Sequence, residues 1–491
     1  MEKTILTQPK KEEKALLLIF LFVPCLLISQ ALDNDIWFLL NSGRFVFENG
    51  FPVVEPFTIH EGFSFVMQQW LTASFFWAIY SKLGVSGLFF FVIVFYALIV
   101  FMVYKICMLI SDGNFMVSYS ISFAVSILIS FFMVTRPYII STFLIVLEVF
   151  CLESFIKKGK KTYLHLLPLI SVLEINFHAA MWPMLFVVLI PYWIDAFKFR
   201  IFIIKGQGYP KKTFAAATVL MAAAGFINPY GLNAMKYLFQ SYGYPDISRM
   251  VAEMQPANIN NGIGKVIFAS MLAVTLTYCL YRKGDSKLRY ILLTLGMGVL
   301  ALSSVRGFLF FAIFAFFPLS FLLRNVKVRE KNQPPQKRQA AVRALLVFLI
   351  CAGLVGGFVY KYRRAVEFAS EPVGASIIDY LSEHADKKTT VLYTSYDIGG
   401  YAEYVGYKCY LDPRAEVFVK KNNGREDIIS EYFRLQIGQL YYEEFLEKYD
   451  FTYLLVPNGD ILYTYLANDP DYRIVCEDKE HRLFQPIAAA D

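Results

Sequence analysis

The sequence predicts an α-helical, polytopic membrane protein of about eleven transmembrane helices, followed by a C-terminal α/β domain. Hydrophobic residues make up 57% of the 491 positions and aromatic residues 17%. Soluble globular domains average about 45–50% apolar residues. Apolar windows of roughly 17–25 residues, the length that crosses a hydrocarbon core, recur up to residue 360. The composition changes sharply after residue 361, where the chain becomes polar and acidic.

We expect transmembrane helices at the apolar stretches, which together form a domain over 1–360. Their approximate ranges are 15–32, 86–110, 115–134, 138–155, 162–177, 181–197, 213–227, 264–281, 288–303, 307–323 and 344–360. A signal peptide has a shorter apolar region that ends in small residues, and no A-x-A-like site precedes Asp33. The first stretch should therefore remain as a transmembrane helix.

Basic residues gather in alternate connections between these stretches. They are Lys10, Lys11 and Lys14; Lys157, Lys158, Lys160 and Lys161; Lys198, Arg200, Lys205, Lys211 and Lys212; Arg282, Lys283, Lys287 and Arg289; and Arg324, Lys327, Arg329, Lys331, Lys337, Arg338 and Arg343. By the positive-inside rule these connections are cytoplasmic. An odd number of spans then places the N-terminus inside the cell and residues 361–491 outside. The formal net charge of +7 is spread between spans, so we expect no nucleic-acid partner.

Residues 361–491 are predicted to form an extracytoplasmic α/β domain. Short β-rich runs at 389–393, 408–411, 451–456, 473–476 and 482–485 alternate with helical stretches at 374–384, 426–435 and 440–449. Cys409 and Cys476 lie in this domain and are candidates for a disulfide bond. The other five cysteines lie inside apolar spans and form no CxxC pair.

The first outer loop, 33–85, is predicted to hold two helices that lie in the membrane interface. Apolar residues follow helical spacing from Ile36 to Phe47, and a second stretch rich in Trp and Phe runs over 68–80. Asp33 and Asp35 stand where the first span ends. Two carboxylates at this spacing have three candidate roles: a general base for a sugar or lipid hydroxyl, ligands of a divalent cation, or the N-cap of the following helix.

The remaining polar groups of interest fall on the same predicted outer face. They are Arg136, the segment from Glu174 to His178, Asn228, Arg249 with Glu253, and Arg306. Ionisable groups at membrane depth are costly and tend to line a cavity or pathway. Their convergence predicts one outward-facing cleft. The alternative is that the ends of loops are polar because they meet water.

Short motifs along nearly the whole chain resemble the GT-C superfamily of integral membrane glycosyltransferases, in particular bacterial members with a soluble C-terminal domain. They are Asp33-x-Asp35-x-Trp37, Gly43, Gly50-x-Pro52, Pro56-Phe57-Thr58, Gln69-Trp70-Leu71, Thr135-Arg136-Pro137, Asn176-x-His178, Asn228-Pro229-Tyr230-Gly231, Tyr396-Asp397-x-Gly399-Gly400-Tyr401 and Asp412-Pro413-Arg414-Ala415-Glu416. The loop departs from the family pattern at Phe38-Leu39, where related loops carry a Trp-His pair, and at Glu55, where they carry Asp.

The resemblance implies a GT-C-like fold and an inverting transfer of a sugar from a polyprenyl-phosphate donor to a cell-envelope acceptor on the outer face of the membrane. In this scheme Asp33 or Asp35 is the catalytic base. The substrate-binding candidates are Arg136, His178, Asn228, Arg249, Glu253 and Arg306, among which Arg136, His178, Arg249 and Arg306 would stabilise the departing lipid phosphate. The acceptor is a glycan, a lipid or a protein, and the C-terminal domain would bind the acceptor or a partner.

Two other functional classes stay open, as does the cofactor. A flippase or transporter of lipid-linked saccharides would carry charges through the membrane midplane and similar halves, and neither is evident in the sequence. A non-catalytic assembly protein would keep the fold alone. The sequence shows no metal-ligand cluster, and the one candidate cofactor is a divalent cation beside the two aspartates.

Overall fold

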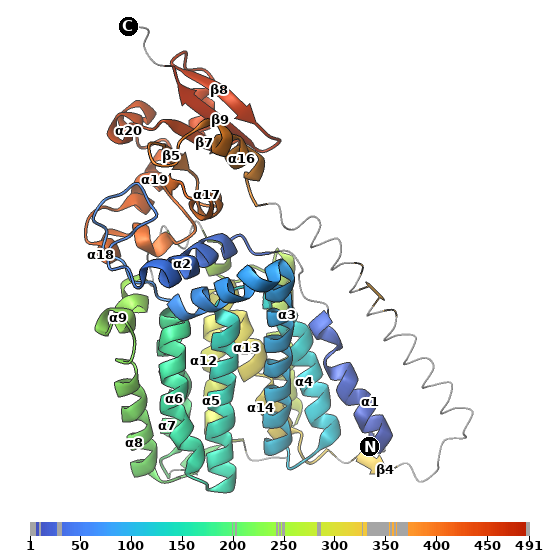
Figure 1. The fold of residues 1–491 in the computed structure, drawn as a ribbon. Helices are drawn as coiled ribbons and strands as arrows, with labels where there is room; N and C mark the ends of the chain where they lie inside the picture. The colour runs from blue at the N-terminus through green and yellow to red at the C-terminus, as the bar shows by residue number, and fades with distance from the viewer. Residues whose placement is uncertain are drawn as a thin grey trace.

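A computed structural model describes residues 6–8, 11–26, 32–198, 200–201, 204–241, 244, 247, 251–281, 286–326, 328–330, 353, 356–357, 360 and 372–487. Arg249, most of the predicted span at 344–360 and the predicted domain boundary at 361 lie outside these residues. The described helices form a bundle, which α2 and the first part of α3 cover at one end. The C-terminal strands and helices lie beyond that end (Figure 1).

The described bundle helices overlap the apolar stretches predicted between residues 15 and 323. They are α1 (Lys11–Leu21), α3 (Trp70–Ile110), α4 (Phe115–Ile129), α5 (Tyr138–Lys158), α6 (Thr162–Phe177), α7 (Trp182–Asp195), α8 (Lys211–Ala224), α11 (Gly262–Leu280), α12 (Leu288–Ser303), α13 (Phe308–Phe314) and α14 (Phe317–Leu322). The shorter α9 (Leu232–Ser241) follows α8, and one-turn helices η1 (Val23–Leu26), η2 (Ser130–Phe132), η3 (Ala179–Met181), η4 (Ala252–Met254) and η5 (Val305–Gly307) join the longer elements.

Several of these helices can cross a membrane. Five helical stretches of the described residues are long and apolar enough: Trp70–Ile110, Phe115–Phe132, Tyr138–Lys158, Gly262–Leu280 and Val305–Leu322. Four shorter apolar helices, Lys14–Leu26, Thr162–Phe177, Ala179–Asp195 and Leu288–Ser303, lie among them. The chain is therefore a multi-pass membrane protein, while the count of about eleven spans stays a prediction.

The helix α3 bends at Gly84, whose backbone angles (φ 59°, ψ −155°) suit glycine rather than residues with a Cβ atom. Its first part lies across the end of the bundle, and its second part runs along the bundle (Figure 1). The sequence predicts an interfacial helix over 68–80 and a separate span from residue 86. These two elements are the two arms of one bent helix.

The helix α2 (Ile36–Asn49) is enclosed more fully than an interfacial helix. Every residue from Ile36 to Gly43 is buried, because α2 packs between α3 on one side and α17 of the C-terminal segment on the other. A Cβ atom on Gly43 would lie 2.1 Å from the carbonyl oxygen of Ala73, so the contact with α3 requires glycine. On the other side, Arg44 donates to the backbone oxygen of Tyr404 at 2.9 Å. The polar side of α2 therefore faces the C-terminal segment.

A buried ion cluster ties three helices together toward the other end of the bundle. Arg289 of α12 pairs with Glu153 of α5 at 2.8 Å and with Asp195 of α7 at 2.8 Å. The hydroxyls of Tyr192 and Tyr290 each donate to Glu153 at 2.9 Å. The sequence places Arg289 among the loop bases that set the topology. Its side chain is instead buried and fully partnered, so it fixes helix packing.

The C-terminal residues fold around one five-stranded sheet. Its strands are β5 (Val391–Thr394), β6 (Lys408–Cys409), β7 (Tyr453–Pro457), β8 (Tyr472–Glu477) and β9 (His481–Pro486), in the order β6-β5-β7-β9-β8. The helices are α16 (Ala375–His384), α17 (Gly399–Val405), α18 (Lys420–Asn423), α19 (Ile428–Gln436), α20 (Tyr442–Tyr449) and α21 (Ile461–Leu466), with the one-turn η6 (Ala415–Phe418). The short pairs β1 (Leu6–Gln8) with β4 (Val328–Glu330), and β2 (Arg200–Ile201) with β3 (Ile204–Lys205), lie elsewhere in the chain.

The strand order shows where this sheet can bind a ligand. β5 pairs in parallel with both β6 and β7, and the chain leaves β5 toward β6 but leaves β7 toward the opposite edge. This divergence is a topological switch point, where open α/β sheets tend to bind ligands.

The strand order also rules out a disulfide bond between Cys409 and Cys476. These residues lie on the opposite edge strands β6 and β8, on the order of 19 Å apart at the usual strand spacing. The disulfide prediction is wrong, and both cysteines are free.

Candidate functional site

The two aspartates of the first outer loop form a tight turn before α2. The backbone N–H of Asp35 donates to Asp33 Oδ1 at 3.1 Å, and the N–H of Ile36 donates to the carbonyl oxygen of Asp33 at 3.0 Å. Asp35 occupies the N-cap position of α2, but its carboxylate makes no capping hydrogen bond. Helix capping therefore does not explain the Asp35 side chain.

Arg136 binds both aspartates from the start of α5. Its Nε lies 2.9 Å from Asp33 Oδ2 and its Nη2 lies 3.2 Å from Asp35 Oδ2. Pro137 follows Arg136 directly and precedes the helix, a placement that suits the fixed φ of proline. The start of α5 thus holds the guanidinium at the end of the bundle that α2 covers.

Glu253 and Arg306 complete the cluster from two further segments. Glu253 Oε2 accepts from Arg136 Nη1 at 3.0 Å and from Arg306 Nη2 at 2.9 Å. The hydroxyl of Ser304 donates to the carbonyl oxygen of Glu253 at 2.9 Å, which ties the loop of η4 to the loop of η5. We call Asp33, Asp35, Arg136, Glu253 and Arg306 the carboxylate–arginine cluster. The sequence predicts that these residues converge, and the structure brings them together.

Burial, together with the charges of the cluster, gives Asp35 an unusual proton affinity. Burial raises the pKa of Asp35 to about 7, with a further increase from the charge of Asp33 and an opposing decrease from Arg136 and Arg306. Burial also works to raise the pKa of Glu253, but Arg136 and Arg306 overcome it and hold that pKa below its usual value. Glu253 is therefore ionised at neutral pH, whereas Asp35 gains and loses its proton there.

His178 lies at the same end of the bundle, at the end of α6. Its Nδ1 is 3.1 Å from the hydroxyl of Ser141 on α5. Burial, helped by the positive charge of Arg306, lowers the pKa of His178 to about 3. The imidazole is therefore neutral and offers a ligand a hydrogen bond but no charge.

Of the other two predicted binding residues, only Asn228 is described, and it lies outside the cluster. Asn228 uses its side chain within its own turn: Nδ2 donates to the carbonyl oxygens of Gly225 and Gly231 at 2.7 and 3.1 Å, and Oδ1 accepts from the N–H of Tyr230 at 2.8 Å. The Asn-Pro-Tyr-Gly motif therefore builds a turn. Arg249 lies outside the described residues, and its role stays a prediction.

A second arginine centre, which sequence reasoning missed, joins the first outer loop to the C-terminal sheet. Arg414 pairs with Glu55 at 3.1 Å, with Glu403 at 3.1 Å and with Asp412 at 2.6 Å. All four side chains are buried, and burial raises the pKa of both Glu55 and Glu403 against the lowering effect of Arg414. The Asp412-Pro413-Arg414 motif looks like a turn in the sequence, and Glu55 is 359 residues away from Arg414, so no local pattern links them.

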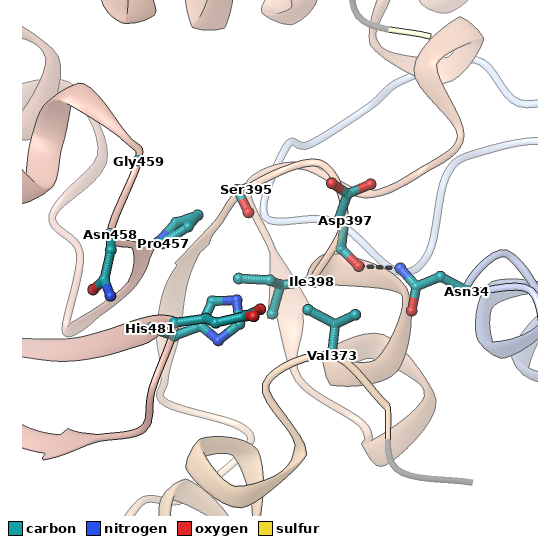
Figure 2. Close-up of a pocket in the computed structure, with 10 residues that line it drawn as sticks. Asn34, Val373, Ser395, Asp397, Ile398, Pro457, Asn458, Gly459 and His481 are labelled. Carbon is teal, nitrogen blue, oxygen red and sulfur yellow. Dashed lines mark hydrogen bonds between the residues drawn. The ribbon is translucent and has the colours of Figure 1, made fainter. Parts of the chain in front are cut away.

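A crevice of about 510 Å³ opens above the aspartate loop, at the ends of β5 and β7. It is lined by Asn34, Val373, Ser395, Asp397, Ile398, Pro457, Asn458, Gly459, Glu480 and His481. The side chain of Asn34, between the two aspartates, donates to the backbone oxygen of Asp397 (Figure 2). The crevice therefore sits at the switch point of the sheet and touches the loop that carries Asp33 and Asp35.

The positive charge between the two aspartates comes from Arg136. Among the described residues, no group of three or more His, Cys, Asp or Glu side chains is placed to hold a metal ion. The guanidinium occupies the position between the carboxylates that a cation would take. A divalent cation stays a prediction, and we assign it no step below.

The chain has the architecture of known membrane glycosyltransferases. The Archaeoglobus fulgidus oligosaccharyltransferase tethered with an acceptor peptide has a TM-score of 0.58 at 12% identity, covering 91% of this chain and 69% of that one. ArnT from Cupriavidus metallidurans, bound to undecaprenyl phosphate, has a TM-score of 0.50 at 11% identity over 97% of both chains. The arabinofuranosyltransferase AftD from Mycobacteria has a TM-score of 0.52 at 12% identity over 99% of this chain and 42% of that one.

These three structures are GT-C proteins, so the chain has the GT-C fold, as its sequence motifs predict. At such low identity the likeness concerns the fold. No protein-family model matches the chain, and a search of curated proteins gives no match. The activity must therefore be inferred from the chain's own residues.

The buried Arg414 centre predicts a strong and specific stability effect. Arg414→Met leaves three buried carboxyl groups without their cation, so we expect a loss of about 3–5 kcal/mol in the free energy of unfolding. Thermal unfolding in detergent and protease digestion of the C-terminal segment measure this effect. Arg425→Met is the control, because Arg425 is exposed and contacts the same loop only at the backbone oxygen of Gly62. Equal stability of the two variants would contradict the link.

Proposed function

We propose that this chain is an inverting glycosyltransferase that moves a sugar from a polyprenyl-phosphate donor to a cell-envelope acceptor on the outer face of the membrane. The observation that carries the proposal is the carboxylate–arginine cluster: a carboxyl group that titrates near neutral pH lies beside two guanidinium groups at one end of a membrane bundle. A transfer of this kind needs a base for the acceptor and positive charge for the leaving phosphate.

The fold neighbours support a lipid-phosphate donor. ArnT of Cupriavidus metallidurans has been captured with undecaprenyl phosphate, and the archaeal oligosaccharyltransferase with an acceptor peptide. In this chain the guanidinium groups of Arg136 and Arg306 are suited to such a phosphate, because arginine stays charged at a partly buried site and can make paired hydrogen bonds with phosphate oxygens. Arg306 is the more accessible of the two.

In the proposed reaction Asp35 acts as the general base. Its carboxylate takes the proton of the acceptor hydroxyl while the hydroxyl oxygen forms a bond to the anomeric carbon of the sugar. The bond between that carbon and the phosphate oxygen breaks on the opposite face, which inverts the configuration. The polyprenyl phosphate leaves with the bonding electron pair, and Arg136 and Arg306 stabilise the added negative charge. Water then removes the proton from Asp35.

The acceptor enters through the crevice of Figure 2 in this proposal. The crevice adjoins the aspartate loop through Asn34, and its walls carry the hydroxyl of Ser395, the carboxylates of Asp397 and Glu480, and the amide of Asn458. Such groups bind hydroxyl-rich molecules by hydrogen bonding. The positive-inside rule supports placing this end of the bundle outside the cell.

The pH dependence of sugar transfer tests Asp35 as the base. The base must be deprotonated to act, so we expect the rate to fall as the pH decreases through about 7 and to reach a plateau above it. Asp35→Asn should lower kcat by about 10²–10⁴-fold, the usual contribution of a general base. The assay is sugar transfer by the purified full chain from a polyprenyl-phosphate-linked sugar.

Asp112→Asn is the matched control, because Asp112 is an exposed acid at a different connection of the bundle that pairs with Lys157. It should retain full transfer. Asp33→Asn, made separately, tests the second carboxylate. Full transfer by both Asp33→Asn and Asp35→Asn would overturn the enzymatic assignment. Movement of the lipid-linked sugar across vesicles without a new glycosidic bond would instead indicate a flippase.

Substitution in the crevice tests the acceptor path. Asp397→Ala removes an exposed carboxylate at the end of β5, so we expect about a tenfold rise in the acceptor KM, the loss of one or two hydrogen bonds, with little change in kcat. Glu444→Gln on the exposed side of α20 is the control and should leave both constants unchanged. An acceptor KM that is the same in both variants would show that the acceptor binds elsewhere.

A further inference from the structure

Among the described residues of the helix bundle, two buried glutamates make no hydrogen bond through their carboxyl groups. Glu148 of α5 and Glu174 of α6 are both 0% exposed, and none of their four carboxyl oxygens has a hydrogen-bond partner among the described residues. Glu153, on the same helix as Glu148, contrasts with them, because Arg289 and two tyrosines satisfy its carboxylate. Glu148 and Glu174 therefore do not join helices through hydrogen bonds, as Glu153 does.

These two side chains carry their protons. An ionised carboxylate without a counter-charge costs several kcal/mol in an apolar interior. The two groups are also near enough to interact electrostatically, so two negative charges would repel one another. A protonated carboxyl group has an O–H that it can donate. Glu174 is thus a neutral hydrogen-bond donor that still needs an acceptor.

The hydroxyl of Ser141 lies between Glu174 and the site. Ser141 is two helical turns from Glu148 on α5, and its hydroxyl is near the carboxyl group of Glu174. The same hydroxyl is 3.1 Å from Nδ1 of His178. The hydrogen bond of the His178 side chain among the described residues is made by Nδ1 and leaves Nε2 for a ligand. The imidazole also interacts electrostatically with Arg306. The polar groups therefore form a line from the bundle interior to the carboxylate–arginine cluster.

We propose that Glu174 and Ser141 are positioning residues that fix the tautomer of His178, so that His178 presents Nε2–H to the phosphate of the lipid donor. This role builds on the lipid-phosphate donor proposed above. In the proposed arrangement the carboxyl O–H of Glu174, which makes no hydrogen bond in the described structure, turns to donate to the nearby hydroxyl oxygen of Ser141. The hydroxyl hydrogen of Ser141 then points to Nδ1 of His178. A neutral imidazole has one N–H, so an accepting Nδ1 leaves the hydrogen on Nε2. No proton is transferred between residues in this arrangement.

The second buried acid, Glu148, is neutral for the same physical reason. Burial opposes the ionisation of both groups, and the charge of an ionised Glu174 would further oppose the ionisation of Glu148.

Three substitutions separate hydrogen bonding from packing. Ser141→Ala removes the hydroxyl, Glu174→Met keeps most of the volume but has no donor, and Glu174→Gln keeps an N–H donor in place of the O–H. Ser154→Ala on α5 is the control, because the Ser154 hydroxyl is also buried but has no hydrogen-bond partner among the described residues. Thermal unfolding of each full-length variant in detergent checks the fold.

The first measurement reads the tautomer directly, by ¹⁵N NMR of the full chain labelled at histidine, with His178→Gln to assign the signal. We expect the wild type, Glu174→Gln and Ser154→Ala to carry the hydrogen on Nε2, and Ser141→Ala and Glu174→Met to show a mixture of tautomers. The same tautomer in all five proteins would overturn the inference. This measurement needs no lipid, so its result does not depend on whether the proposed function is correct.

The second measurement is the affinity for undecaprenyl phosphate alone. Ser141→Ala and Glu174→Met should weaken binding about tenfold, the effect of one hydrogen bond to a charged group, and Glu174→Gln should bind within twofold of the wild type. Binding by Glu174→Met that equals the wild type would overturn the role of His178 toward phosphate. A wild type that shows the expected tautomer but binds no undecaprenyl phosphate would refute the proposed donor and the phosphate contact together, leaving only the tautomer.

Discussion

The contact between Arg136 and the two aspartates is the interaction on which the site depends. It joins the loop before α2 to the start of α5, and through Glu253 it reaches the loop of Arg306. Without the guanidinium, Asp33, Asp35 and Glu253 would repel one another at a partly buried position. With it, the cluster holds three carboxylates and two guanidinium groups, so Asp35 can accept a proton while Glu253 keeps both arginines in place.

The described residues hold three arginine centres, and the exposure of their side chains distinguishes their roles. Arg289 holds α5, α7 and α12 together, and Arg414 fixes the C-terminal sheet to the first outer loop; both are buried among carboxylates. Breaking such buried pairs costs stability and provides no access for a ligand. In the cluster around Arg136, the side chain of Asp35 is 27% exposed and that of Arg306 is 35% exposed. Only this centre can exchange a protein contact for a substrate contact.

The sequence predicts the features of this molecule that a local pattern determines, and not those that depend on contacts between distant segments. The length of the apolar stretches predicts the helices. The alternation of basic loops predicts that Asp33, Arg136, Glu253 and Arg306 lie at one end of the bundle. The Arg414 and Arg289 centres could not be predicted, because each unites segments far apart in the chain whose side chains read locally as a turn or a loop base. The same limit applies to α2, since its polar face gives no sign in the sequence that the C-terminal segment covers it.

A structure of the full chain with bound undecaprenyl phosphate tests the central claim most directly. The phosphate should lie within hydrogen-bond distance of Arg306 and Arg136, with Asp35 next to it and open toward the crevice. Asp33 should keep its contact with Arg136 in the bound state. A phosphate bound at another face of the helix bundle, away from both guanidinium groups, would contradict the account.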